Sequence, residues 1–260
     1  MPDVCEIAHR PTACHSATAT RDARRRARFT YANIPTMRDA PRHEGCAPDD
    51  LPDSRDPVER AAASAAAGVR GRLSSAETER LSVMTSTDPD PRVRAASLAA
   101  LARSAERSAA AAQWRGASRD PDASVRRRAA EVAPLLGTAT TGRGLLDLLE
   151  DTDPLVAEAA AWALGETAPP SRETITALSE AATAHADPLV RESAVAALGA
   201  LGDPGGLDAV LAACRDRPAI RRRAVLALAP FSGPDVEAAI RNALEDPDWQ
   251  VRQAAEDLVS

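Results

Sequence analysis

The sequence predicts an all-α protein with the architecture of an α-solenoid, and three observations carry this prediction. Hydrophobic residues make up 44% of the 260 residues while aromatic residues make up only 2%, and alanine dominates the apolar set. Alanine is the best helix former, whereas the core of a sandwich or barrel needs β-branched and aromatic side chains. A pattern with a period of about 31 residues recurs through most of the chain. Repeats of this length, each too small to bury its own apolar faces, are typical of stacked helix pairs.

The first 52 residues differ from the rest, and we expect them to be a disordered leader. They hold six prolines, the run Arg24–Arg26 and no sustained apolar period, so they bury too little apolar surface to offset the entropy of ordering. Three of the four cysteines and three of the four histidines lie in this segment. Because of this contrast, we expect that Met37 is the true start and that residues 1–36 are not translated.

Residues 53–260 carry the repeat, and the second helix of each unit is its clearest part. Six copies align on a valine or isoleucine, here called the anchor, that follows a turn rich in Asp and Pro: Val93, Val125, Val156, Val190, Ile220 and Val251. The residue four positions after the anchor is alanine in five copies, and the residue eight positions after it is apolar in all six. These positions fall on one stripe of an α-helix, and the preceding Asp and Pro suit its N-cap and first turn. We expect Gly165 and Gly199, nine positions after their anchors, to end their helices.

A second helical pattern precedes each copy and predicts the first helix of each pair. The expected ranges are 76–85, 105–117, 144–150, 172–184, 206–214 and 235–245. A fainter copy of the repeat starts at Asp56–Pro57–Val58. The sequence therefore predicts an α-solenoid of about six to seven helix pairs over residues 53–260.

The consensus D-x-D-P-x-V-R-x-x-A-x-x-A-L-G resembles the short HEAT-like repeats named after phycobilisome lyases. Segments 159–165 and 193–199 resemble this pattern most closely. The resemblance covers roughly residues 53–260. It implies that the α-solenoid is a right-handed superhelix and that its function is mainly the binding of a partner protein. Such repeats occur in scaffolds, in bilin lyase subunits and as appendages of unrelated enzymes, so the fold barely constrains the function. A chaperone similar to a bilin or tetrapyrrole lyase is one alternative.

The position directly after the anchor is arginine in five of six copies, with Ala157 as the exception. We call these residues the arginine ladder: Arg94, Arg126, Arg191, Arg221 and Arg252. We expect their guanidinium groups to pair with acidic residues in the turns of the same or a neighbouring repeat, and so to hold stacked repeats in register. Binding of a ligand is the alternative role for this ladder.

The resemblance implies that the second helices line the concave face of the array. Positions two and six after the anchor point away from the core, and the candidate partner-binding residues there are Arg127, Glu158, Trp162, Glu192, Arg222 and Leu226. Mixed charge with an exposed Trp162 and Leu226 suits a protein or peptide partner, because aromatic and arginine side chains are the usual anchors of interfaces. The alternative for Trp162 is packing against the adjacent helix.

A nucleic-acid partner is a further alternative, as in HEAT-like DNA glycosylases. The runs Arg126–Arg128 and Arg221–Arg223 would contact phosphate, and Trp114, Trp162 or Trp249 would stack on bases. All 32 basic residues are arginine, against 38 acidic residues, for a net charge of −6. Residues 53–260 alone hold 24 arginines and 31 acidic residues, and this acidic balance argues against a nucleic-acid binder.

The sequence offers no catalytic or cofactor site, so we expect a non-enzyme without a cofactor. His185 is the one histidine after residue 52, which leaves Ser–His–Asp and Cys–His arrangements without a base. Cys5, His9, Cys14 and His15 have zinc-binding atoms, but their spacing fits no familiar zinc site. We expect Cys214 to be a small core residue of a first helix. The N-terminus has no apolar signal-peptide region and no run is long enough to span a membrane, so we expect a soluble, cytoplasmic protein.

Overall fold

The computed structural model describes residues 54–105, 107–167 and 169–260. The expected leader, with Met37 and the candidate zinc ligands Cys5, His9, Cys14 and His15, lies outside these residues. Within the described ranges the chain forms thirteen α-helices and one short 3-10 helix, and no strand. The prediction of an all-α fold is therefore confirmed.

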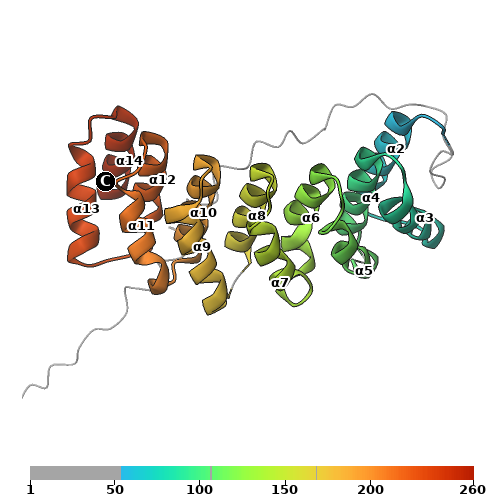
Figure 1. Cartoon of the computed structure of the whole chain (residues 1–260), viewed down its shortest axis with the longest axis horizontal. Helices are drawn as coiled ribbons and strands as arrows, with labels where there is room; N and C mark the ends of the chain where they lie inside the picture. Colours follow the sequence, from blue (N-terminus) through green and yellow to red (C-terminus); the bar gives the residue numbers. More distant parts are fainter. Residues whose placement is uncertain (1–53, 106, 168) are drawn as a thin grey trace, which may run out of the picture.

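The helices form six consecutive pairs after one single helix (Figure 1). The single helix is α2 (Pro57–Arg70). The pairs are α3 (Ser75–Thr87) with α4 (Pro91–Arg103), α5 (Ser108–Ala117) with α6 (Ala123–Leu136), α7 (Thr138–Leu149) with α8 (Pro154–Glu166), α9 (Arg172–Ala184) with α10 (Pro188–Leu201), α11 (Leu207–Ala213) with α12 (Pro218–Ala227), and α13 (Pro234–Leu244) with α14 (Trp249–Val259). The 3-10 helix η1 (Pro204–Gly206) leads into α11.

The pairs stack side by side, so that the even-labelled helices pack against each other in one layer and the odd-labelled helices from α3 onwards form the other (Figure 1). The core lies between the two layers. All six anchors are at most 1% exposed, and leucines such as Leu101, Leu164 and Leu198 fill the space around them. This arrangement is the predicted α-solenoid.

Aspartate side chains start most of the even-labelled helices, as the repeat pattern predicts. Asp90, Asp122, Asp153, Asp187 and Asp248 are N-caps, and each carboxylate accepts a hydrogen bond from the main-chain N–H two residues later. An N-cap of this kind satisfies a donor that the first helical turn leaves unpaired. Helix α12 is an exception, because its N-cap is Arg217, whose side chain makes no capping bond.

The prediction that Gly165 and Gly199 end their helices is wrong. Helix α8 continues to Glu166 and α10 to Leu201, so both glycines lie inside their helices. A Cβ atom at Gly165 would lie 2.8 Å from Cα of Ala197 on α10, and one at Gly199 would lie 2.7 Å from Cα of Ala227 on α12. These glycines therefore allow neighbouring even-labelled helices to approach closely.

Helix α7 differs most from its expected range, 144–150, because it starts at Thr138. Threonine and glycine are poor helix formers, and residues 138–144 contain three threonines and two glycines. Packing overrides this propensity: Thr141 and Leu145 are fully buried, and a Cβ atom at Gly144 would lie 2.7 Å from the Trp114 ring.

No helix in the described part of the chain combines the length and the apolar character that crossing a bilayer requires.

Candidate functional site

The ladder arginines join consecutive repeats through paired hydrogen bonds. Arg94 on α4 donates from Nε and Nη2 to the two carboxylate oxygens of Asp120, at 2.8 and 2.7 Å. Its third nitrogen, Nη1, donates to the main-chain oxygen of Asp88, at 2.9 Å. Asp88 belongs to the turn before α4, whereas Asp120 belongs to the turn before α6. One guanidinium group thus fixes its own turn and holds the turn of the next repeat.

The same contact recurs along the array, and we call each such Arg–Asp pair a rung. The further rungs at ladder positions are Arg126–Asp151, Arg191–Asp216 and Arg221–Asp246, with donor–acceptor distances of 2.7–3.1 Å. The Arg126 guanidinium lowers the pKa of Asp151 from its ordinary value by hydrogen bonding, and Arg191 and Arg221 do the same for Asp216 and Asp246. The charged form of each aspartate is therefore the form that the folded array favours.

One rung was missed by the sequence analysis. Arg60 on α2 donates from Nε and Nη2 to Asp88, at 2.9 Å for both bonds. The sequence analysis placed the start of the faint first copy at Asp56–Pro57–Val58 and assigned it no ladder residue. Alignment on the N-cap would have found the rung, because Arg60 follows Asp56 by the four positions that separate Arg94 from Asp90.

At one joint between consecutive repeats, that between α8 and α10, both the arginine and the aspartate of a rung are missing. Ala157 takes the arginine position on α8 and is fully buried, while His185 takes the aspartate position in the turn before α10. Nδ1 of His185 accepts the main-chain N–H of Asp187 at 3.0 Å, the turn bond that Asp151 makes with Asp153 at 2.9 Å. Because both charges are absent together, no half-buried charge is left without its partner at this joint.

Arg252 makes the main-chain hydrogen bonds of a ladder arginine but not the bonds to a carboxylate. Its Nη1 donates to the main-chain oxygens of Asp246 and Pro247, at 2.6 and 3.2 Å. The described residues provide no following turn, and Arg252 pairs with no carboxylate among them.

The candidate partner-binding residues lie on the layer of even-labelled helices, and several of them contact other residues of this layer. Arg127 pairs with Glu131 of the same helix at 3.0 Å, and Glu192 on α10 pairs with Arg223 on α12 at 3.3 Å. The main-chain oxygen of Glu158 accepts the Ser193 hydroxyl of α10 at 3.1 Å. Arg222 forms no ion pair within the described ranges.

Trp162 and Leu226 are half-buried rather than fully exposed, and this position of Trp162 fits the alternative that it packs against neighbouring helices. Trp162 packs against the main core, and Leu226 packs against a smaller cluster formed by Val225, Val251 and neighbouring residues of α13 and α14. Each keeps part of its surface accessible on the even-labelled layer.

Two exposed leucines on this layer escaped the sequence analysis. Leu155 and Leu189, which directly precede the anchors of α8 and α10, are 45% and 53% exposed. Leu155 stands seven residues before Trp162, which places both on the same side of α8. A comparison of this position across the six copies would have found them, since three of the other four copies carry a polar residue there, Arg92, Ser124 or Gln250, and the fourth carries the small Ala219. Leu155, Trp162 and Leu189 together form what we call the apolar patch.

Comparison with known proteins agrees with this architecture. The family of HEAT repeats matches residues 114–185 and again residues 142–226. The X-ray structure of the Escherichia coli protein YibA is similar, with 16% sequence identity, a TM-score of 0.60, and coverage of 80% of this chain and 78% of that chain. The chain is a HEAT-like repeat protein.

A designed armadillo repeat protein, solved in complex with the peptide (KR)4, shares the fold of the HEAT-like array. It has 18% identity and a TM-score of 0.50, and the match covers 70% of this chain and 98% of that chain. Human deoxyhypusine hydroxylase is less similar, with 20% identity, a TM-score of 0.40 and coverage of 80% of both chains. No curated protein matches the sequence.

The arginine runs of the HEAT-like array are largely occupied by acidic partners. Arg126 and Arg221 form rungs. In the run Arg126–Arg128, Arg128 also pairs with Glu131, at 2.6 Å. Trp114, a candidate for base stacking, is instead buried, and its Nε1 donates to the main-chain oxygen of Ala129 at 2.7 Å. Trp249 remains exposed, at 65%. Among the described residues, no group of three or more His, Cys, Asp or Glu side chains is arranged to hold a metal ion.

Proposed function

We propose that this HEAT-like array is a non-catalytic scaffold or adaptor that binds a partner protein through the layer of even-labelled helices. The observation that carries this proposal is the apolar patch. Exposed leucines at the same position of two adjacent repeats, with a half-buried tryptophan seven residues further along α8, lose unfavourable contact with water when a partner covers them. Patches of this kind on a stable fold are typical of protein interfaces.

The packing of the helices supports the even-labelled layer as the concave one. Gly165 against Ala197 and Gly199 against Ala227 bring neighbouring even-labelled helices close together. In the other layer, α11 and α13 leave a cavity between them. We infer that closer spacing in one layer curves the array towards that layer, so that the apolar patch faces the inside of the curve.

The charges around the apolar patch indicate what the partner carries. Glu158 and Glu192 lie on the same two helices as the patch, while Arg127 on α6 and Arg222 on α12 flank it. A polypeptide with apolar side chains and charges of both signs would complement this surface. The designed armadillo protein bound to the peptide (KR)4 supports the use of this architecture for polypeptide binding.

The chemistry of the array supports a non-catalytic role. His185 is the one histidine of the described residues, and its Nδ1 already accepts a main-chain hydrogen bond within a turn. A general base needs a free nitrogen within reach of the reacting group.

The test replaces both exposed leucines, as Leu155→Asp with Leu189→Asp, in the full chain used as bait for affinity capture from native lysate. The matched control is Val83→Asp on α3, because Val83 is equally exposed but lies in the odd-labelled layer. We expect the wild type and the control to retain the same protein in stoichiometric amount, and the double variant to lose it while keeping its helical circular dichroism. Full retention by the folded double variant would contradict the proposal, as would retention of nucleic acid alone, released steeply by salt.

A further inference from the structure

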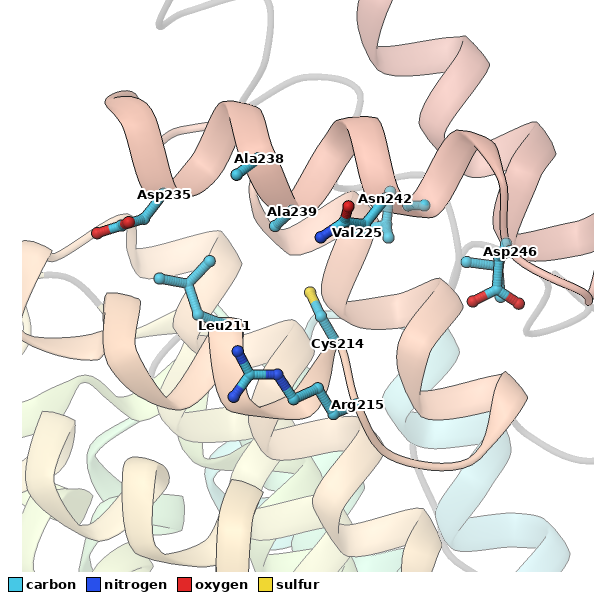
Figure 2. Close-up of a pocket in the computed structure, with 11 residues that line it drawn as sticks. Leu211, Cys214, Arg215, Val225, Asp235, Ala238, Ala239, Asn242 and Asp246 are labelled. Carbon is cyan, nitrogen blue, oxygen red and sulfur yellow. The ribbon is translucent and has the colours of Figure 1, made fainter.

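A cavity of about 330 Å³ opens between α11 and α13, in the layer of odd-labelled helices (Figure 2). It exists because α11 has only seven residues and because α13 presents the small side chains of Ala238 and Ala239 across the joint. Val225 and Val251, each 1% exposed, also line the cavity, and Leu211 forms part of one wall. The joint therefore offers apolar surface that no large side chain of the array covers.

The thiol of Cys214 points into this cavity from the end of α11 (Figure 2). Burial raises the pKa of the thiol to about 11, so the group is neutral at physiological pH. A neutral, half-buried cysteine behaves as a small apolar side chain. The sulfur thus extends the apolar wall of the cavity.

Three polar side chains surround the apolar part and have no partner in the described chain. Arg215 follows α11, whereas Asp235 and Asn242 project from α13, on the other side of the cavity (Figure 2). No hydrogen bond or ion pair among the described residues engages their side chains. The nearby Asp246, in contrast, is already held by Arg221 at 2.7 Å. One positive charge, one negative charge and one amide are therefore available to a ligand.

We propose that this cavity receives one aliphatic side chain of a partner polypeptide, with an acidic neighbour facing Arg215 and a basic neighbour facing Asp235. The volume lies at the lower end of the range for ligand pockets, which fits one side chain and its flanking main chain. The Asn242 amide both donates and accepts, so it complements a peptide group. This site is separate from the even-labelled layer and does not depend on the function proposed for that layer.

The test is titration of the full, isotope-labelled chain with synthetic pentapeptide amides, observed by NMR. The probes carry a central leucine flanked by one aspartate and one lysine, in both orders, and the reference peptides carry glycine in place of leucine. We expect at least one leucine peptide to shift the resonances of α11 and α13 and to bind at least about tenfold more tightly than its glycine counterpart, because burial of the leucine side chain supplies the difference. The bound peptide should also slow alkylation of Cys214, followed by mass spectrometry of its fragment.

The variant Ala239→Leu fills the cavity from α13 and should abolish the shifts. The matched control is Ala212→Leu, since Ala212 is an exposed residue of α11 that does not line the cavity, and it should leave binding unchanged. Three results would overturn the proposal: no shift in α11 and α13 with any peptide at millimolar concentration, equal binding of the glycine peptides, or unchanged binding to a folded Ala239→Leu variant. The Leu155→Asp and Leu189→Asp variant should bind the peptides normally, which separates this site from the apolar patch.

Discussion

The guanidinium group of a ladder arginine is planar and carries five N–H donors, and the array uses both of its edges. In Arg126, the Nε–Nη2 edge meets the carboxylate of Asp151, while Nη1 donates to the main-chain oxygen of Asp120, at 2.9 Å. A lysine has one compact charge and could not match both partners with fixed geometry. The rungs therefore position turns as well as balance charge.

Arg126→Ala should lower the free energy of unfolding by about 2–3 kcal/mol, because it leaves the largely buried carboxylate of Asp151 without its charged partner. Arg143→Ala serves as the control. Arg143 also joins two repeats, through Glu173 at 2.8 Å, but both side chains are mostly exposed, so its loss should cost less than about 1 kcal/mol. Urea unfolding at pH 7 measures both values.

The pH dependence gives this prediction a second check. Arg126 lowers the pKa of Asp151 in the folded state, so the rung contributes fully above the unfolded pKa of about 3.9 and loses its contribution as the pH falls through the lower, folded value. The difference between wild type and Arg126→Ala should therefore shrink below about pH 4. Equal costs for the two variants at pH 7, or a difference that does not change with pH, would show that the rung does not stabilise the array.

Some of these residues could be read from the sequence and others could not. The period predicts a row of arginines, because one position of a repeated helix always meets the same surroundings. It does not say whether Arg94 pairs within its own repeat or with Asp120 of the next, since that depends on how the repeats stack. Leu155 and Leu189 were missed because only positions two and six after the anchor were compared for the outward side of the second helices. The residue directly before the anchor lies on the same outward side of the helix.

At the scale of helices, glycine sets how closely the even-labelled layer packs. Gly165→Ala should destabilise the array by about 1–3 kcal/mol, because the added Cβ would lie 2.8 Å from Cα and Cβ of Ala197 and the backbone of α10 would have to move. Gly116→Ala on α5 is the control. Nothing lies within 4 Å of a Cβ there, so better helix propensity should leave stability unchanged or raise it by up to about 1 kcal/mol. Thermal and urea unfolding compare the two, and a neutral Gly165→Ala would contradict the close-packing account.

Helix boundaries follow from the sequence where caps are present and fail where packing decides. Helix α9 matches its expected range, and the Ser171 hydroxyl accepts the Thr174 N–H at its start. Helix α7 starts six residues earlier than expected, because buried contacts of Thr141 compensate for poor helix formers. Gly165 and Gly199 illustrate the same limit: a glycine near a helix end and a glycine at a helix crossing look identical in one sequence.

At the scale of the whole molecule, the joint without a rung and the apolar patch coincide. Ala157 and His185 remove the charged pair between α8 and α10, and Leu155 lies two residues before Ala157 while Leu189 lies four residues after His185. Between α8 and α10 this joint is held by the close approach of Gly165 to Ala197 and by the Ser193 hydroxyl bonded to α8, while the exposed ion pair of Arg143 with Glu173 joins α7 and α9 of the same two repeats. Because Leu155 and Leu189 stand where other repeats carry Arg92, Ser124 and Gln250, the exposed surface at this position is less polar, and a partner protein gains most from burial of such a surface.

Hydrogen exchange of the full chain, with and without the captured partner, tests the central claim that the partner covers this part of the even-labelled layer. The account predicts slower exchange in α8 and α10 when the partner is bound, with little change in α3 and α5 of the other layer, because covering the apolar patch suppresses local opening beneath it. Protection confined to the odd-labelled helices, or no change in α8 and α10 despite stoichiometric binding, would contradict it.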